Sequence, residues 1–132
     1  MKQRVNKMKR VLIVEDEVLI AAEIEMYLEE QGFQVVGHCI RGKHAIELVA
    51  ELTPDIVLLD IALKDNVDGI EVAEYIRANH DIPFVFLTSH SDAVTLEKAY
   101  KTSPYGYIDK PFNEKELMRN IRGALLKHAA EK

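Results

Sequence analysis

The sequence is poor in cysteine, in excess positive charge and in long apolar runs. Its one cysteine, Cys39, excludes an internal disulfide bond, and its apolar neighbours Val35, Val36 and Ile40 favour a place in the core over a reactive thiol. The formal net charge of −5 argues against nucleic acid as a direct partner, because binding to a phosphate backbone needs a basic surface. No apolar run has the length of a signal-peptide core or a membrane span. We therefore expect a cytoplasmic protein with neither membrane nor direct nucleic-acid binding.

Positive charge is concentrated in the first ten residues, which carry five lysines and arginines and precede an apolar run of four residues. We interpret residues 1–10 as a basic N-terminal leader and residues 11–129 as one domain. A chain of 132 residues is long enough for one domain with a real core, and no low-complexity linker divides it. Hydrophobic content of 48% with 30% charged residues is typical of a globular protein.

Short apolar runs, rich in β-branched residues and without polar alternation, occupy residues 11–14, 56–59 and 83–87. This pattern is typical of strands that are buried on both faces of a parallel sheet. Residues 34–39 and 105–108 are further strand candidates. Apolar residues recur at helical spacing between the strands. The fourth helix is expected after Asp92, with a stripe of Ala93, Leu96 and Tyr100, and the last helix after Asn113.

Strand and helix thus alternate five times, which predicts a flavodoxin-like (βα)5 fold of the α/β class: a doubly wound, five-stranded parallel sheet with helices on both faces. In the strand order 2-1-3-4-5, the first and third strands lie side by side at the topological switch point, where ligands bind beyond the carboxyl ends of the strands. This order brings Glu15 and Asp16 to Asp60, and the fourth and fifth strands bring Thr88 and Lys110 to the same edge.

Carboxylates this close repel one another and need a cation. Oxygen ligands without a cysteine or histidine cluster favour Mg²⁺ or Mn²⁺ over zinc, and Mg²⁺ commonly completes its shell with phosphate oxygens. A carboxylate nucleophile (Asp60), a hydroxyl donor (Thr88) and an ammonium (Lys110) are the groups that in-line phosphoryl transfer requires. Each alone has a simpler explanation as a helix-end acid, a loop hydroxyl or a surface charge. Together they predict metal-dependent phosphoryl transfer to Asp60.

In order and spacing, these residues resemble the receiver domain of two-component response regulators over nearly the whole chain. The matching segments are residues 14–17, Asp60 after Ile-Val-Leu-Leu, and residues 68–71, 87–89 and 106–112. The resemblance implies that a histidine kinase or a histidine phosphotransfer protein donates a phosphoryl group to Asp60. It implies a signalling domain that catalyses only its own phosphorylation and dephosphorylation, rather than an enzyme with a separate substrate.

The resemblance also implies roles for single residues. Asp16, Asp60 and the backbone carbonyl of Ala62 would ligate Mg²⁺ directly, and Glu15 would act largely through bound water. Lys110 would pair with the phosphoryl oxygens and precede a cis bond to Pro111.

On activation, Thr88 would hydrogen-bond a phosphoryl oxygen, and Tyr107 would turn inward when Thr88 moves. The surface of the fourth helix, the last strand and the terminal helix would then change. That surface is a face for an unknown downstream effector or for a homodimer.

Two features depart from the family pattern. Glu15 stands where aspartate is common, and the loop from Asp60 to Gly69 is one residue longer and lacks a proline. A phosphohydrolase of the haloacid-dehalogenase type is the alternative, because it also combines a strand-end aspartate with Mg²⁺, but it carries a second aspartate where this chain has Ala62. A flavodoxin fits poorly, since residues 15–17 would repel the phosphate of its flavin.

Overall fold

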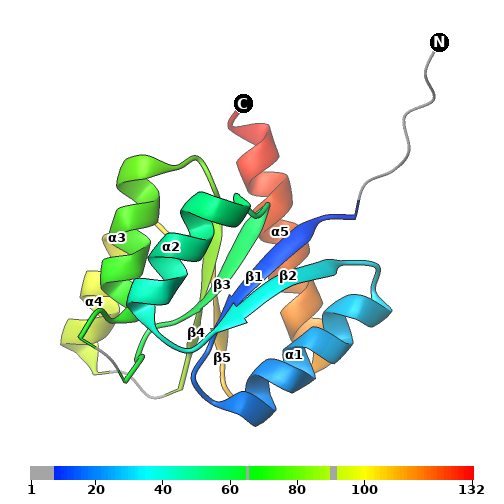
Figure 1. The fold of residues 1–132 in the computed structure, drawn as a ribbon, viewed down its shortest axis with the longest axis horizontal. Coiled ribbons are helices and arrows are strands. Elements are labelled where there is room, and N and C mark those ends of the chain that lie inside the picture. The colour runs from blue at the N-terminus through cyan, green and yellow to red at the C-terminus, as the bar shows by residue number, and fades with distance from the viewer. Residues whose placement is uncertain (1–7, 65, 90–91) are drawn as a thin grey trace.

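The computed structural model describes residues 8–64, 66–89 and 92–132, so most of the predicted leader lies outside the described residues. Within them, strands and helices alternate five times along the chain (Figure 1). The elements are β1 (Arg10–Val14), α1 (Val18–Glu30), β2 (Gln34–Cys39), α2 (Gly42–Leu52), β3 (Ile56–Asp60), α3 (Gly69–Asn79), β4 (Phe84–Thr88), α4 (Ala93–Tyr100), β5 (Gly106–Asp109) and α5 (Glu114–Ala130).

The strands form one parallel sheet in the order β2-β1-β3-β4-β5, which confirms the predicted fold class. Strand β1 lies between β2 and β3, so the chain changes direction across the sheet at β1 and β3. Residues that end these two strands therefore meet at one edge. Asp60 of β3 pairs with Leu87 of β4, and Thr88 of β4 pairs with Asp109 of β5, so the ends of these three strands are also aligned.

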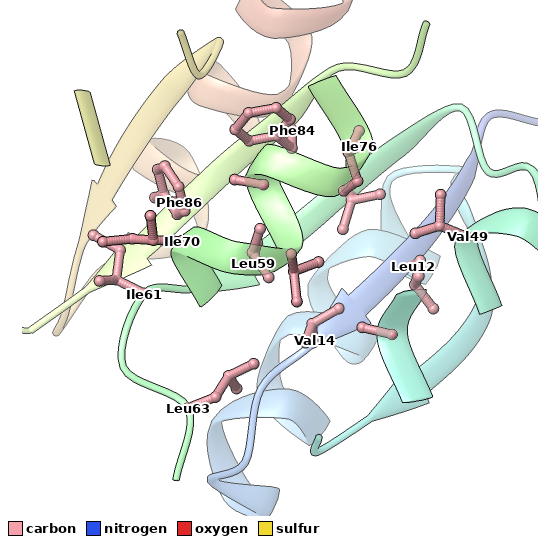
Figure 2. Packing of buried hydrophobic residues seen from close by; sticks show 14 of the residues in the cluster. Leu12, Val14, Val49, Leu59, Ile61, Leu63, Ile70, Ile76, Phe84 and Phe86 are labelled. Carbon is pink, nitrogen blue, oxygen red and sulfur yellow. The ribbon is translucent and has the colours of Figure 1, made fainter. Parts of the chain in front are cut away.

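Helices cover both faces of the sheet: α2, α3 and α4 one face, α1 and α5 the other (Figure 1). Every residue of β3 and β4 is buried, as the continuous apolar runs predict. Figure 2 shows the first of the two cores, where Leu12 and Leu59 of the sheet pack near Val49 of α2 and Ile76 of α3. Cys39 belongs to this core and is 3% exposed, as expected from its neighbours.

The predicted apolar stripe of α4 is wrong as a core contact. Leu96 is 39% exposed and Tyr100 is 72% exposed, whereas Ala99 is the one buried residue of this helix. With eight residues, α4 makes about two turns, and Ala99 is its one side chain in the buried core. Its larger apolar side chains instead border a groove between α4 and β5, lined by Thr88, Ala93, Leu96, Tyr100 and Tyr107.

Within the described residues, no helix combines the length and the apolar composition that crossing a membrane requires.

Candidate functional site

Asp60 is the last residue of β3 and is 5% exposed. The N–H of Ala62 donates to its Oδ1 at 3.0 Å, which orients the carboxylate. The next helix begins directly against this strand end, because Gly69 lies so close that a Cβ atom there would be 2.0 Å from the carbonyl oxygen of Asp60. Asp68 caps this helix through a capping box with Glu71, so it has a structural role. The position of Asp60 is thus set by backbone contacts.

Glu15 and Asp16 follow β1 directly and lie beside Asp60, as the strand order predicts. One carboxylate oxygen from each of the three residues lies within 4.8 Å of the others. Asp16 accepts a hydrogen bond from the N–H of Lys64 at 3.1 Å, and Glu15 accepts one from the N–H of Glu17 at 3.0 Å. Glu15 is fully buried, and its Oε1 has no hydrogen-bond partner of good geometry among the described residues. Three converging carboxylates, one of them fully buried, fit a hard divalent cation.

Lys110 supplies positive charge to this cluster from the loop after β5. Its backbone N–H donates to the carbonyl of Thr88 at 2.7 Å, and its peptide bond to Pro111 is cis, as the family resemblance implies. Its Nζ lies 2.7 Å from Glu15 Oε1, 3.2 Å from Glu17 Oε1 and 3.3 Å from Asp60 Oδ2. One ammonium therefore contacts three carboxylates at once.

The electrostatics follow from burial and from these contacts. Burial raises the pKa of Glu15 from 4.5 to about 7, and the charge of Asp60 adds to the rise, while Lys110 and the N–H of Glu17 oppose it. For Lys110, burial lowers the pKa, but Glu15, Asp60 and Glu17 outweigh it and raise the pKa to about 12. Lys110 is thus charged at every physiological pH, whereas Glu15 without a metal holds a proton for part of the time near neutrality.

Thr88 ends β4 and is 6% exposed, close to Asp60 on the neighbouring strand. Tyr107 lies on β5 opposite Phe86, half-buried, and its ring lies between two others. The ring centroids are 6.0 Å apart for Phe86 and Tyr107 and 6.3 Å apart for Tyr100 and Tyr107, the second pair nearly parallel at 8°. Thr88 and Tyr107 both line the groove between α4 and β5. All the side chains singled out from the sequence therefore lie at one edge of the sheet or in the adjoining groove.

Sequence reasoning missed three contacts here: the bond from Lys110 to Glu17, the N–H of Lys64 on Asp16, and the approach of Gly69 to Asp60. The third had a signal in the sequence, because glycine is common where two backbone segments approach each other closely. The first two depend on how loops fold over the strand ends, and residue spacing does not encode that.

The sequence matches the profile of the response regulator receiver domain over residues 11–122. The DNA-binding response regulator MtrA of Mycolicibacterium paratuberculosis is 35% identical over 125 residues, which cover 93% of this chain and 54% of that protein. The transcriptional regulatory protein PdtaR of Mycobacterium tuberculosis is 35% identical over 117 residues, which cover 89% of this chain and 57% of that protein. The chain thus spans about half the length of the curated relatives it matches.

A solved structure is similar to this chain in both fold and sequence. The signal receiver domain of a modulated diguanylate cyclase from Desulfovibrio desulfuricans has a TM-score of 0.91 and 37% identity, with 96% of this chain and 100% of that chain covered. The fold, the strand-end cluster and the sequence match all lead to one assignment: the chain belongs to the response regulator receiver domain family.

Proposed function

We propose that this receiver domain accepts a phosphoryl group on Asp60 from a histidine kinase or a histidine phosphotransfer protein, with Mg²⁺ (or Mn²⁺) as cofactor. One observation carries the proposal: Asp60 is a nearly buried carboxylate that shares one edge of the sheet with two further acids, a hydroxyl and an ammonium. These are the groups that phosphoryl transfer to a carboxylate needs.

In the proposed reaction, a carboxylate oxygen of Asp60 attacks the phosphorus of the donor phosphohistidine. A P–O bond forms as the P–N bond breaks, and the imidazole leaves with the bonding electron pair. Lys110 pairs with one oxygen of the transferred group and the hydroxyl of Thr88 donates to another, so that the chain's own donors meet the developing charge. Glu15, Asp16, Asp60 and the carbonyl of Ala62 would hold the divalent cation, which neutralises charge on the transferred group when bound.

We further propose that phosphorylation is read through α4, β5 and α5. Thr88, which lies at the site, and Tyr107 both line the groove between α4 and β5. The ring of Tyr107 stacks on that of Tyr100 in α4. A movement of Thr88 would therefore change the packing between β5 and α4. Exposed apolar side chains on α4 give this face the character of an interaction surface, for a downstream effector or for a second copy of the chain.

The phosphodonor would dock beside the site on α1. Val18 and Leu19 begin this helix directly after the acidic loop and are 66% and 85% exposed. Two such side chains next to Asp16 are an anchor for an apolar surface of the donor protein. We propose that the protein is cytoplasmic, the compartment in which its proposed phosphodonors act. The net charge of −5 supports an output through protein contacts, with no direct binding of this domain to nucleic acid.

The domain would catalyse only its own phosphorylation and dephosphorylation. A phosphohydrolase of the haloacid-dehalogenase type is not favoured, because the position two residues after Asp60 is Ala62, which has no carboxylate to act as general acid.

Acetyl phosphate with Mg²⁺ tests the proposal. Intact-mass measurement should show one added phosphoryl group on the wild-type chain and none on Asp60→Asn, whose amide nitrogen and oxygen are weak nucleophiles. Chelation of the metal should suppress labelling of the wild type. Equal labelling of Asp60→Asn and wild type would refute the assignment of Asp60.

A further inference from the structure

Glu17 is the solvent-exposed member of the carboxylates that contact Lys110. Its Oε1 accepts a hydrogen bond from Lys110 Nζ at 3.2 Å, and its side chain is 56% exposed, against 0% for Glu15 and 6% for Asp60. Its backbone is fixed, because Glu17 is the N-cap residue of α1 and its N–H donates to Glu15 Oε2 at 3.0 Å. Glu17 therefore holds the ammonium from the side on which solvent, and any phosphodonor, reaches the site.

The three contacts of Lys110 leave little room for a fourth. The ammonium donates hydrogen bonds to Glu17 and Asp60, Glu15 Oε1 lies 2.7 Å from the same nitrogen, and the Lys110 side chain is only 7% exposed, so the space around Nζ is filled. A phosphoryl oxygen that arrives at Asp60 must therefore displace one of them to pair with Lys110.

The exposure of each partner decides which contact yields. Glu15 is fully buried, so its carboxylate cannot turn out into water if it loses Lys110, which makes its release costly. Releasing Glu17 returns a largely exposed carboxylate to water, and exposed ion pairs contribute little. Asp60 is the proposed acceptor and stays in place, so Glu17 is the partner that gives way.

We propose that Glu17 is a positioning residue that competes with the incoming phosphoryl group for the Lys110 ammonium, and so limits the rate at which Asp60 is phosphorylated. The inference rests on the proposed function of Asp60. It assigns to the third acid of the acidic loop a role separate from metal binding: Glu17 holds Lys110 until a phosphoryl group replaces it.

The experiment compares Glu17→Gln with Glu29→Gln, using the whole chain at saturating Mg²⁺. Glu29 is an exposed glutamate at the other end of α1, so its substitution removes the same charge far from Lys110. We expect Glu17→Gln to raise the saturated rate of labelling by acetyl phosphate about twofold to fivefold, the size of an exposed ion pair, and Glu29→Gln to leave it unchanged.

Two further arms separate competition for Lys110 from simple repulsion of an anionic donor. Phosphoramidate carries less negative charge than acetyl phosphate, so repulsion predicts a smaller gain with phosphoramidate, whereas competition predicts the same gain with both donors. In a Lys110→Ala background, competition predicts that the gain from Glu17→Gln disappears.

A gain that depends on donor charge, a gain that persists without Lys110, or a rate equal to that of Glu29→Gln would each overturn the inference. Wild-type labelling shows independently whether the proposed function holds: if the wild-type chain is labelled and Glu17→Gln gains nothing, only the role of Glu17 fails.

Discussion

Replacing Gly69 with alanine would disturb the backbone contact that positions Asp60. Gly69 is the first residue of α3, and its N–H donates to the carbonyl of Ile61 at 3.1 Å. A Cβ atom there would lie 2.0 Å from the carbonyl oxygen of Asp60 and 2.9 Å from Ile61 Cα. Both are backbone atoms, so no side-chain rotation relieves the overlap. Either α3 or the end of β3 must move by about 1 Å to restore an ordinary contact.

The size of the effect follows from this geometry. Overpacking of this kind costs about 1 to 3 kcal/mol, and the better helix propensity of alanine returns at most about 1 kcal/mol. We expect Gly69→Ala to lower the free energy of unfolding by about 1 to 2 kcal/mol. A shift of about 1 Å in a reacting group slows a reaction by up to about 100-fold, so labelling of Asp60 by acetyl phosphate should fall well beyond the loss of stability.

Gly123 supplies the matched control. It is an exposed residue within α5, and a Cβ atom there would meet nothing within 4 Å. Gly123→Ala should therefore stabilise the protein by up to about 1 kcal/mol and leave labelling unchanged. Urea unfolding and intact-mass kinetics on both variants measure the two effects. If Gly69→Ala unfolds at the wild-type urea concentration and labels at the wild-type rate, the close approach does not constrain Asp60.

Three further predictions concern charge and stacking. Lys110→Ala leaves the buried carboxylates unpaired, so urea unfolding at pH 8 should show a loss of about 3 kcal/mol that shrinks at pH 5, where Glu15 is protonated. Because the pKa of Glu15 rises from 4.5 to about 7 on folding, the stability that this group contributes is full below pH 4.5 and lost as the pH rises through 7. Mg²⁺ binding should compete with protonation of Glu15. Titration calorimetry should therefore show that the affinity of the protein for Mg²⁺ falls below pH 7, by no more than about tenfold per pH unit. Tyr100→Ala should lower the free energy of unfolding by about 1 kcal/mol, because the stack on Tyr107 is lost, whereas Tyr100→Phe should leave it almost unchanged. An equal loss in both variants would count against a role for the stack.

The fold was predictable because its strongest signals are local. Strands buried on both faces need continuous apolar runs, and β3 and β4 show them without interruption. The alternation of strands with helices then leaves few topologies, and the order β2-β1-β3-β4-β5 brings Glu15 and Asp16 to Asp60. Strand bounds differ from the predicted ones by about one residue, since a ladder ends with its last hydrogen bond and not with its last apolar side chain.

The site was less predictable where loops set the geometry. Lys110 contacts three carboxylates at once, those of Glu15, Glu17 and Asp60. This arrangement depends on how the loop between β5 and α5 folds over the strand ends. Sequence places all four residues at one edge, but it does not say which oxygen an ammonium reaches. The division of the acidic loop into a buried Glu15 and an exposed Glu17 is likewise visible only in the folded structure.

The wrong prediction for α4 has a physical meaning in a receiver domain. A helix with Ala99 as its one fully buried residue buries little apolar surface, so displacing it costs less than displacing α3, which buries five residues. Thr88 and Tyr107 line the groove beside α4. The backbone carbonyl of Thr88 accepts a hydrogen bond from the N–H of Lys110, whose side chain contacts Asp60. On the proposed function, a change of charge at Asp60 would act on Lys110 and Thr88, and the helix with the fewest buried residues lies next to them. In the switch proposed above, α4 has to move, and apolar residues that would fix it if they faced the core remain exposed, so the apolar pattern of the sequence misleads at this helix.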